Sequence, residues 1–107
     1  MKFNVDIKNL ANELDFEVDD VKMLIMNFLQ VVTNDLLELS RAIESEDFEE
    51  IAHNAHSIKG SSANLRLKEV SLIAKEIELN AQDKKRDFDY KGAYVKLKNK
   101  IDGVADV

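Results

Sequence analysis

Apolar residues recur at intervals of three and four along most of the chain, which is the spacing of one face of an α-helix. The longest of these stripes predicts a helix over residues 18–44, preceded by a short helix over residues 6–14. Three more stripes predict helices over residues 47–65, 67–82 and 88–104. The positions expected to face the core are Ile7, Leu10, Ala11, Leu14, Val21, Met23, Leu24, Ile25, Met26, Phe28, Leu29, Val32, Leu36, Leu39 and Ile43 in the first two helices, and Phe48, Ile51, Ala52, Ala55, Ile58, Ser62, Leu65, Val70, Ile73, Ala74, Ile77, Ala81, Tyr90, Tyr94, Leu97, Ile101 and Val104 in the others.

The breaks between these stripes are short, so successive helices are expected to be antiparallel neighbours. Asp47 stands at the start of one helix with Glu50 three residues later, which is the spacing of a capping box. The polar run of residues 82–89 predicts the loop before the last helix, and no segment shows the alternation of a strand. The predicted fold is all-α: an up-down-up-down antiparallel four-helix bundle with a short extra N-terminal helix, in a single domain over residues 1–107.

The composition agrees with a helical fold and excludes several kinds of chemistry. The 107 residues include no Cys, no Pro and three Gly, so thiolate metal sites and disulfides are excluded and helix breakers are few. The formal net charge of −6 argues against binding to a nucleic-acid backbone. Asp6 and Lys8 interrupt the apolar residues near the N-terminus, and no apolar run reaches membrane-spanning length. We therefore expect a cytoplasmic monomer with no signal peptide, membrane anchor or nucleic-acid partner.

The most informative residues lie in the segment AHSIKGSSANL, residues 55–65, within a predicted helix. His56, Lys59 and Gly60 share a face of that helix, because residues three and four apart lie side by side. A glycine inside a helix costs about 1 kcal/mol relative to alanine. The presence of Gly60 beside an imidazole therefore indicates that another molecule approaches the helix closely at this position.

The histidine of this segment is predicted to face solvent among small side chains. Steps of about 100° per residue turn His56 roughly 120° away from the core direction of its helix. An exposed helix face is usually filled with Glu, Lys or Gln. Small residues around His56 therefore indicate clearance for a docking partner. The neighbours of His56 on this face are Ala52, His53, Lys59, Gly60 and Ala63.

The segment that begins at His56 resembles the signature of the histidine-containing phosphotransfer (HPt) domain. That signature is His, a variable position, an aliphatic residue, Lys, Gly, two small residues, two further positions, an aliphatic residue and Gly. Residues 56–66, HSIKGSSANLR, match it everywhere except at the last position, where Arg66 stands in place of glycine. A glycine there would adopt the left-handed conformation that ends a helix, so either Asn64 takes that role or the turn differs. The resemblance covers nearly the whole chain.

The resemblance implies a phosphorelay carrier rather than an enzyme. His56 would accept a phosphoryl group from a receiver-domain aspartate or a sensor kinase and pass it to another receiver aspartate, while Lys59 would stabilise the phosphoryl charge. A histidine that titrates near pH 6.5 can act as a neutral nucleophile without a base. The chain has no GxxxxGK loop for ATP, so it is expected to have no cofactor of its own and to rely on Mg²⁺ from the receiver. The receiver docking surface would consist of Ala52, His53, Gly60 and Ala63.

Alternative functions remain open. The chain would also suit the N-terminal HPt module of a chemotaxis-type histidine kinase, or a non-catalytic helical adaptor in which the histidine is incidental. Glu49, His53 and His56 share a face and offer metal-ligating atoms. However, metal sites of helical bundles project inward and need a second Glu-x-x-His, so no metal ligand is predicted. The sequence leaves the partners, the signal and the direction of phosphoryl flow undetermined.

Overall fold

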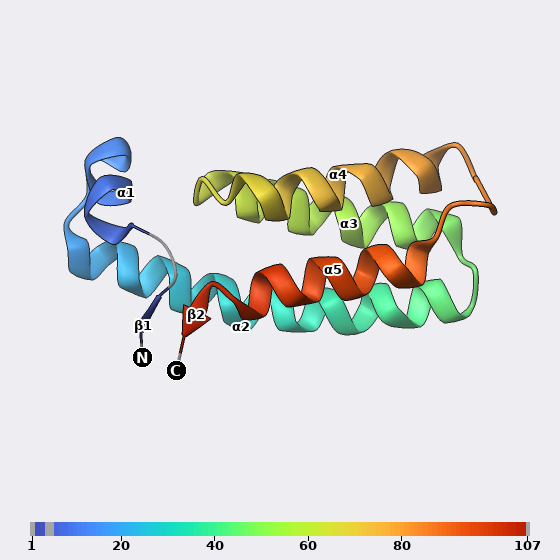
Figure 1. Ribbon diagram of the computed structural model, residues 1–107, viewed down its shortest axis with the longest axis horizontal. Helices are drawn as coiled ribbons and strands as arrows, with labels where there is room; N and C mark the ends of the chain where they lie inside the picture. The colour runs from blue at the N-terminus through green and yellow to red at the C-terminus, as the bar shows by residue number, and fades with distance from the viewer. Residues whose placement is uncertain (1, 4–5, 107) are drawn as a thin grey trace.

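The computed structural model describes residues 2–3 and 6–106, most of which lie in five helices (Figure 1). The all-α prediction is confirmed for the body of the chain. The expectation of no strands is wrong at its two ends, where two short segments pair antiparallel, with Lys2 opposite Asp106 and Phe3 opposite Ala105. A pairing of two residues is too short to produce a periodic pattern. The elements are β1 (Lys2–Phe3), α1 (Ile7–Leu14), α2 (Val18–Glu44), α3 (Phe48–Asn64), α4 (Lys68–Gln82), α5 (Tyr90–Asp102) and β2 (Ala105–Asp106).

The helix α2 runs the length of the molecule; α1, α3 and α5 pack on it, whereas α4 packs on α3 and α5 (Figure 1). α3 contacts both α2 and α4, and α5 contacts both α4 and α2, so these four helices surround one core. The short helix α1 packs on α2 near the N-terminal end of α2. The longest dimension of the molecule is 43 Å, close to the length of about 40 Å that a 27-residue helix such as α2 has.

Aspartate side chains fix where three of the helices begin. Asp6 accepts a hydrogen bond from the backbone N–H of Asn9 at 3.0 Å, at the start of α1. At the start of α3, Asp47 accepts one from Glu50 at 3.2 Å, which confirms Asp47 as the cap, while the N–H of Asp47 donates to the carbonyl of Ala42 and not to the side chain of Glu50 as in a capping box. Asp89 caps α5 in the same way. Each carboxylate satisfies a backbone N–H that has no partner within the helix.

The core contains most of the residues that the periodicity placed there, but not all of them. Met23 and Met26 were expected to be buried and are 69% and 54% exposed, and Leu24 is 37% exposed. The apolar stripe of α2 is wider than the surface that its neighbours α1, α3 and α5 cover. Several predicted residues are only partly buried against the core, namely Ile7, Leu14, Leu29, Phe48, Ala52 and Tyr94.

The turn that ends α3 shows which residue adopts the left-handed conformation in place of the signature's glycine. Arg66 itself adopts the left-handed conformation, with a φ of 60°, while Asn64 is the last helical residue. The N–H of Leu67 donates to the carbonyl of Ser62 at 2.9 Å, and the N–H of Arg66 donates to that of Ala63 at 3.0 Å. These two bonds form a Schellman motif with arginine at the position that glycine favours.

Candidate functional site

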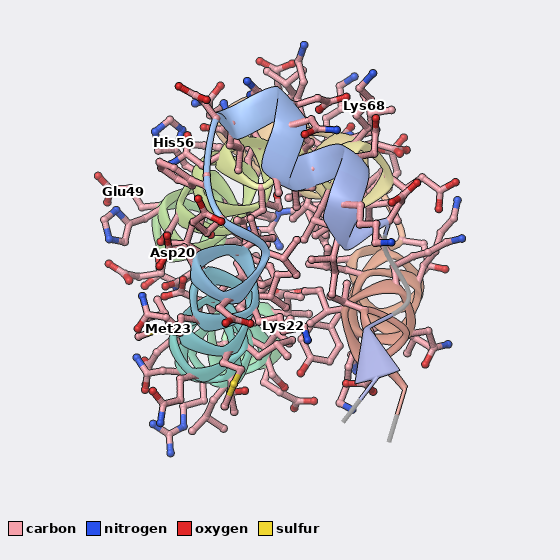
Figure 2. All side chains as sticks on the ribbon, turned by 90° about the vertical axis from the view of Figure 1, so that its left-hand side faces the viewer. Asp20, Lys22, Met23, Glu49, His56 and Lys68 are labelled. Carbon is pink, nitrogen blue, oxygen red and sulfur yellow. The ribbon has the colours of Figure 1, made fainter. Side chains whose placement is uncertain are left out.

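His56 projects from the outer side of α3, and 65% of its side chain is exposed (Figure 2). The opposite side of the same helix is anchored in the core, where Ala55 and Ile58 are fully buried and Ile51 is 1% exposed. This burial fixes the rotation of α3 about its axis, because a turn of the helix would bring its apolar side chains into water. The predicted exposure of His56 is therefore a consequence of the apolar pattern on the other side of its helix.

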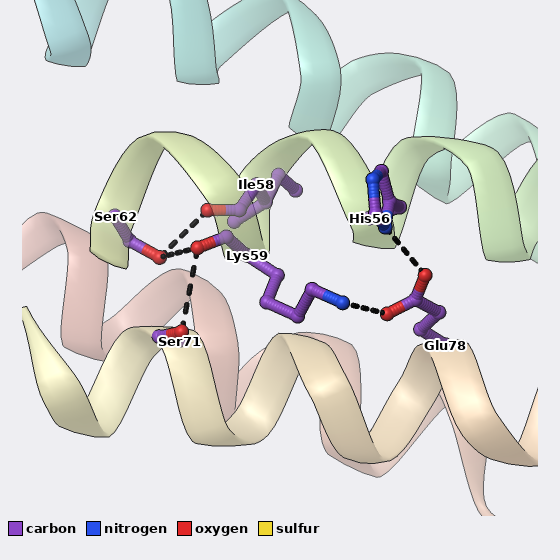
Figure 3. Close-up of polar contacts among 6 residues, drawn as sticks. All are labelled: His56, Ile58, Lys59, Ser62, Ser71 and Glu78. Carbon is purple, nitrogen blue, oxygen red and sulfur yellow. Dashed lines mark hydrogen bonds and ion pairs between the residues drawn. The ribbon is translucent and has the colours of Figure 1, made fainter. Parts of the chain in front are cut away.

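The residue that completes the site lies on α4. The Oε2 atom of Glu78 is 2.6 Å from Nδ1 of His56, and its Oε1 atom accepts a hydrogen bond from Nζ of Lys59 at 2.7 Å (Figure 3). Glu78 is only 5% exposed, so its carboxylate is almost entirely held between these two partners. The histidine and the lysine that sequence reasoning placed on one face are thus joined through a third side chain.

Glu78 is ionised in this arrangement. Its burial acts to raise the pKa of the carboxyl, but the hydrogen bonds and positive charge of Lys59 and His56 outweigh burial, and the pKa lies below its ordinary value. An ionised carboxylate can only accept hydrogen bonds, so Nδ1 of His56 carries the donated proton. In the neutral imidazole the other ring nitrogen, Nε2, then keeps its lone pair.

Sequence reasoning missed Glu78, although a signal was present. It stands 22 residues after His56, on a helix where no motif drew attention to it. Its neighbours one turn away on α4, Ala74 and Ala81, are both buried. A carboxylate on the buried face of a helix must be paired with a positive charge or a hydrogen-bond donor. That requirement alone identifies Glu78 as a candidate functional residue.

A network of serine hydroxyls supports the backbone around Lys59. Ser62 is fully buried, and its hydroxyl donates to the carbonyl of Ile58 at 2.6 Å. The hydroxyls of Ser62 and Ser71 also reach the carbonyl of Lys59, at 3.1 and 3.3 Å (Figure 3). Because Ser71 lies on α4, this contact joins α3 to α4 close to the site.

The small residues around His56 leave its outer side open. A Cβ atom added to Gly60 would meet nothing within 4 Å, so packing within this chain gives no reason for the glycine. Ala63 and His53 are exposed, whereas Ala52 is half-buried against the core. The structure therefore brings the predicted docking residues to one side of α3, with Ala52 contributing partly to the core.

A second carboxylate lies on the α2 side of the histidine. The hydroxyl of Ser57 donates to Oδ2 of Asp35 at 3.0 Å, which ties α3 to α2 directly beside His56. In residues 2–3 and 6–106, no group of three His, Asp or Glu side chains is placed to hold a metal ion. The face shared by Glu49, His53 and His56 is thus not assembled into a ligand set. None of the helices described has the length and apolar content needed to cross a membrane.

The fold and the site together define a class of protein: a helical bundle in which an exposed histidine, here His56, is hydrogen-bonded to a buried carboxylate, here Glu78. The family model of the Hpt domain matches residues 23–106, and the chain belongs to this family. Hpt domains carry phosphoryl groups on histidine in two-component phosphorelays, where they interact with receiver domains and kinases, and they contain no kinase domain. Neither the comparison with curated proteins nor the comparison with solved structures gave a significant match.

Proposed function

We propose that this chain is a phosphorelay carrier in which Nε2 of His56 accepts the phosphoryl group. The observation that carries the proposal is the 2.6 Å hydrogen bond between Nδ1 of His56 and the buried carboxylate of Glu78. This bond fixes the tautomer that leaves a lone pair on Nε2, and it also fixes the orientation of the ring. The exposed side chain of His56 then meets the donor without any movement of α3.

The transfer balances with the groups of this site and of a phosphorylated receiver. The lone pair of Nε2 forms a bond to phosphorus, and the P–O bond to the receiver aspartate breaks, so the aspartate leaves as a carboxylate. The imidazole becomes positively charged, with its proton still on Nδ1 and held by Glu78. The negative charge of Glu78 stabilises this ring. The reverse sequence delivers the phosphoryl group to the aspartate of a second receiver.

Lys59 supplies positive charge beside the reacting nitrogen. Its ammonium group contacts Glu78 at 2.7 Å and its side chain is 30% exposed, so it can approach the phosphoryl oxygens without a change in α3. Phosphoryl transfer depends chiefly on positioning and charge stabilisation. The Mg²⁺ ion is expected to come from the receiver partner.

The scaffold for this role is the set of helices α2 to α5, which we infer to be the antiparallel up-down-up-down bundle predicted from the sequence, with α1 as an extra helix. The receiver is expected to dock over Ala52, His53, Gly60 and Ala63. Both partners of such a relay, receivers and sensor kinases, act in the cytoplasm, and we place this chain there.

The proposal is tested by incubating the purified chain with a phosphorylated receiver domain. Label should appear on the chain as an acid-labile and base-stable adduct, and ³¹P NMR should assign it to the Nε2 position. His56→Gln should abolish labelling, whereas His53→Gln, the matched control on the same helix, should not. Equal loss of labelling in both variants would rule out His56 as the acceptor.

The role of Glu78 is separated from that of the acceptor by two substitutions. Glu78→Gln keeps an oxygen that can accept from Nδ1 but removes the charge, whereas Glu78→Ala removes both. We expect transfer to slow by about tenfold to a hundredfold in Glu78→Gln and further in Glu78→Ala. The pH profile of transfer should also change in Glu78→Gln. An unchanged rate and profile in both variants would show that Glu78 is only structural.

The docking surface is tested at Gly60. Because an added Cβ meets nothing within this chain, Gly60→Ala should raise stability by up to about 1 kcal/mol. Gly60→Glu should keep the helical circular dichroism signal yet slow transfer strongly, because its side chain occupies the space that the receiver needs. Transfer at the wild-type rate in Gly60→Glu would exclude close approach of the receiver at this residue.

A further inference from the structure

The carboxylate of Glu78 serves two partners in the unphosphorylated protein. Its Oε2 atom lies 2.6 Å from Nδ1 of His56, and its Oε1 atom accepts a hydrogen bond from Nζ of Lys59 at 2.7 Å (Figure 3). Glu78 is buried, whereas 30% of the side chain of Lys59 is exposed. The lysine can therefore turn toward a group on the outer side of α3, while Glu78 stays against the ring.

A phosphoryl group on Nε2 of His56 competes with Glu78 for this lysine. The group carries about two negative charges, and Lys59 lies three residues after His56, on the same face of α3. When the ammonium group turns toward the phosphoryl oxygens, the charge of Glu78 is left to the ring alone. The carboxylate is shielded from water, where a hydrogen bond to a charged partner is strong. Phosphorylation thus strengthens the hold of Glu78 on the Nδ1 proton.

The proton on Nδ1 decides how readily the phosphoryl group leaves. With Nδ1 protonated, cleavage of the P–Nε2 bond returns the electron pair to Nε2 and releases a neutral imidazole. With Nδ1 unprotonated, the same cleavage leaves a negatively charged ring, which is a poor leaving group. A phosphohistidine that has lost this proton is therefore slow to pass its phosphoryl group to any acceptor.

We propose that Glu78 sets the lifetime of the phosphorylated carrier by keeping the Nδ1 proton on the phosphorylated ring. This inference rests on the phosphoryl carrier role proposed above and extends it to the reaction with water. In that reaction the oxygen of water forms a bond to phosphorus and the P–Nε2 bond breaks. The products are dihydrogen phosphate and a neutral imidazole that still has its proton on Nδ1. The carboxylate that speeds onward transfer thus also limits how long the phosphoryl group is held without a receiver.

Other ionisable groups lie on the helix faces next to the ring. They are His53 and Lys59 on α3, Lys75 on α4 and Asp35 on α2. Lys75 lies one turn before Glu78, and Asp35 accepts a hydrogen bond from Ser57, the residue after His56. The lysines and a protonated His53 disfavour a positive ring, whereas Asp35 favours it. Glu78 has the largest effect, because it makes the direct hydrogen bond to the ring and is the most buried of these groups.

The lifetime is measured on the isolated chain, without a receiver. His53→Gln is the background, so that phosphoramidate, a small donor with a P–N bond, labels His56 alone. After the donor is removed, ³¹P NMR follows the loss of phosphohistidine and the growth of inorganic phosphate as the pH is varied.

Glu78→Gln should lengthen the half-life at about pH 8 by about fivefold or more, because an amide holds the ring proton less strongly than a carboxylate. The two half-lives should converge at low pH, where the solvent protonates the ring in both proteins. The matched control is Glu76→Gln, which changes an exposed glutamate of the same helix and should leave the half-life unchanged.

The proton itself is observed by ¹⁵N NMR of the phosphorylated ring. In the chain that keeps Glu78, Nδ1 should give the signal of a protonated nitrogen at a pH where Glu78→Gln gives that of an unprotonated one. An unprotonated Nδ1 beside Glu78, or equal half-lives in Glu78→Gln and Glu76→Gln, would overturn the proposal.

The carrier role is judged separately, by transfer from a phosphorylated receiver. Transfer to His56 together with a half-life that Glu78 does not change excludes the lifetime role alone. If no receiver labels His56 but Glu78→Gln lengthens the half-life of the chemically introduced phosphohistidine, the carrier role fails and the effect of Glu78 on the ring proton stands.

Discussion

Replacing Arg66 with glycine should stabilise this protein. Arg66 adopts a φ of 60° in the turn between α3 and α4, and the matching position of the HPt signature is a glycine. Arg66 lies ten residues after His56, beyond the end of α3 and outside the contacts made by the histidine. The substitution therefore changes the free energy of unfolding without touching the reacting groups.

The size of the effect follows from three contributions. The left-handed region destabilises the folded state by about 1–2 kcal/mol for an L-residue, and glycine avoids this strain. Glycine also makes the unfolded chain more flexible, which lowers the free energy of unfolding by about 0.4–1 kcal/mol. The ion pair of Arg66 with Glu13, at 3.8 Å with both side chains about half exposed, contributes a few tenths of a kcal/mol at most. The net gain is about 0.5 kcal/mol, which raises Tm by about 2–4 °C.

Thermal and urea unfolding followed by circular dichroism measure this gain. Glu46→Gly, at a second left-handed position with a φ of 53°, should also stabilise. Asn64→Gly should destabilise, by up to about 1 kcal/mol, because Asn64 is helical. If Arg66→Gly leaves stability unchanged or lowers it, the arginine is not strained in solution and the reasoning fails.

Three further outcomes are expected. The lowered pKa of Glu78 means that its contribution to stability is complete above its ordinary value of 4.5 and is lost as the pH falls below it; urea unfolding between pH 3 and 7 should therefore show a flatter profile for Glu78→Gln than for the wild type. Asp47→Ala removes the cap of α3 and should cost about 1 kcal/mol in the same assay; no loss would show that water replaces the cap. Leu39→Ala empties a site with 0% exposure and should cost about 2–5 kcal/mol, while a cost below about 1 kcal/mol would contradict its burial.

Part of the candidate site was predictable because it is local. His56, Lys59 and Gly60 lie within one helix, and their common face follows from its repeat. The exposure of His56 follows from the buried residues on the opposite side of that helix. The bond between Ser62 and Ile58 spans four residues and follows from the same helical repeat. Each of these features needs only the geometry of a single helix.

The turn at Arg66 shows where local reasoning reached its limit. The missing glycine identified the right segment but not the conformation adopted there. The backbone bonds from Leu67 and Arg66 to α3 stabilise the turn whichever residue occupies it. The conformational strain at Arg66 destabilises the folded state by about 1 kcal/mol. The hydrogen bonds of the turn and the packing of α3 and α4 stabilise the folded state by more than this.

The sequence by itself determined the helices, the cap of α3 at Asp47 and the exposed face of His56, because each depends on residues within a few positions of one another. Only the tertiary structure decided that Glu78 meets His56 and Lys59, because α3 and α4 must pack in one register before residues 22 and 19 positions apart come within hydrogen-bond distance. It also decided that Met23 and Met26 face solvent. Periodicity shows that a helix face is apolar, whereas the neighbouring helices determine which part of that face is covered.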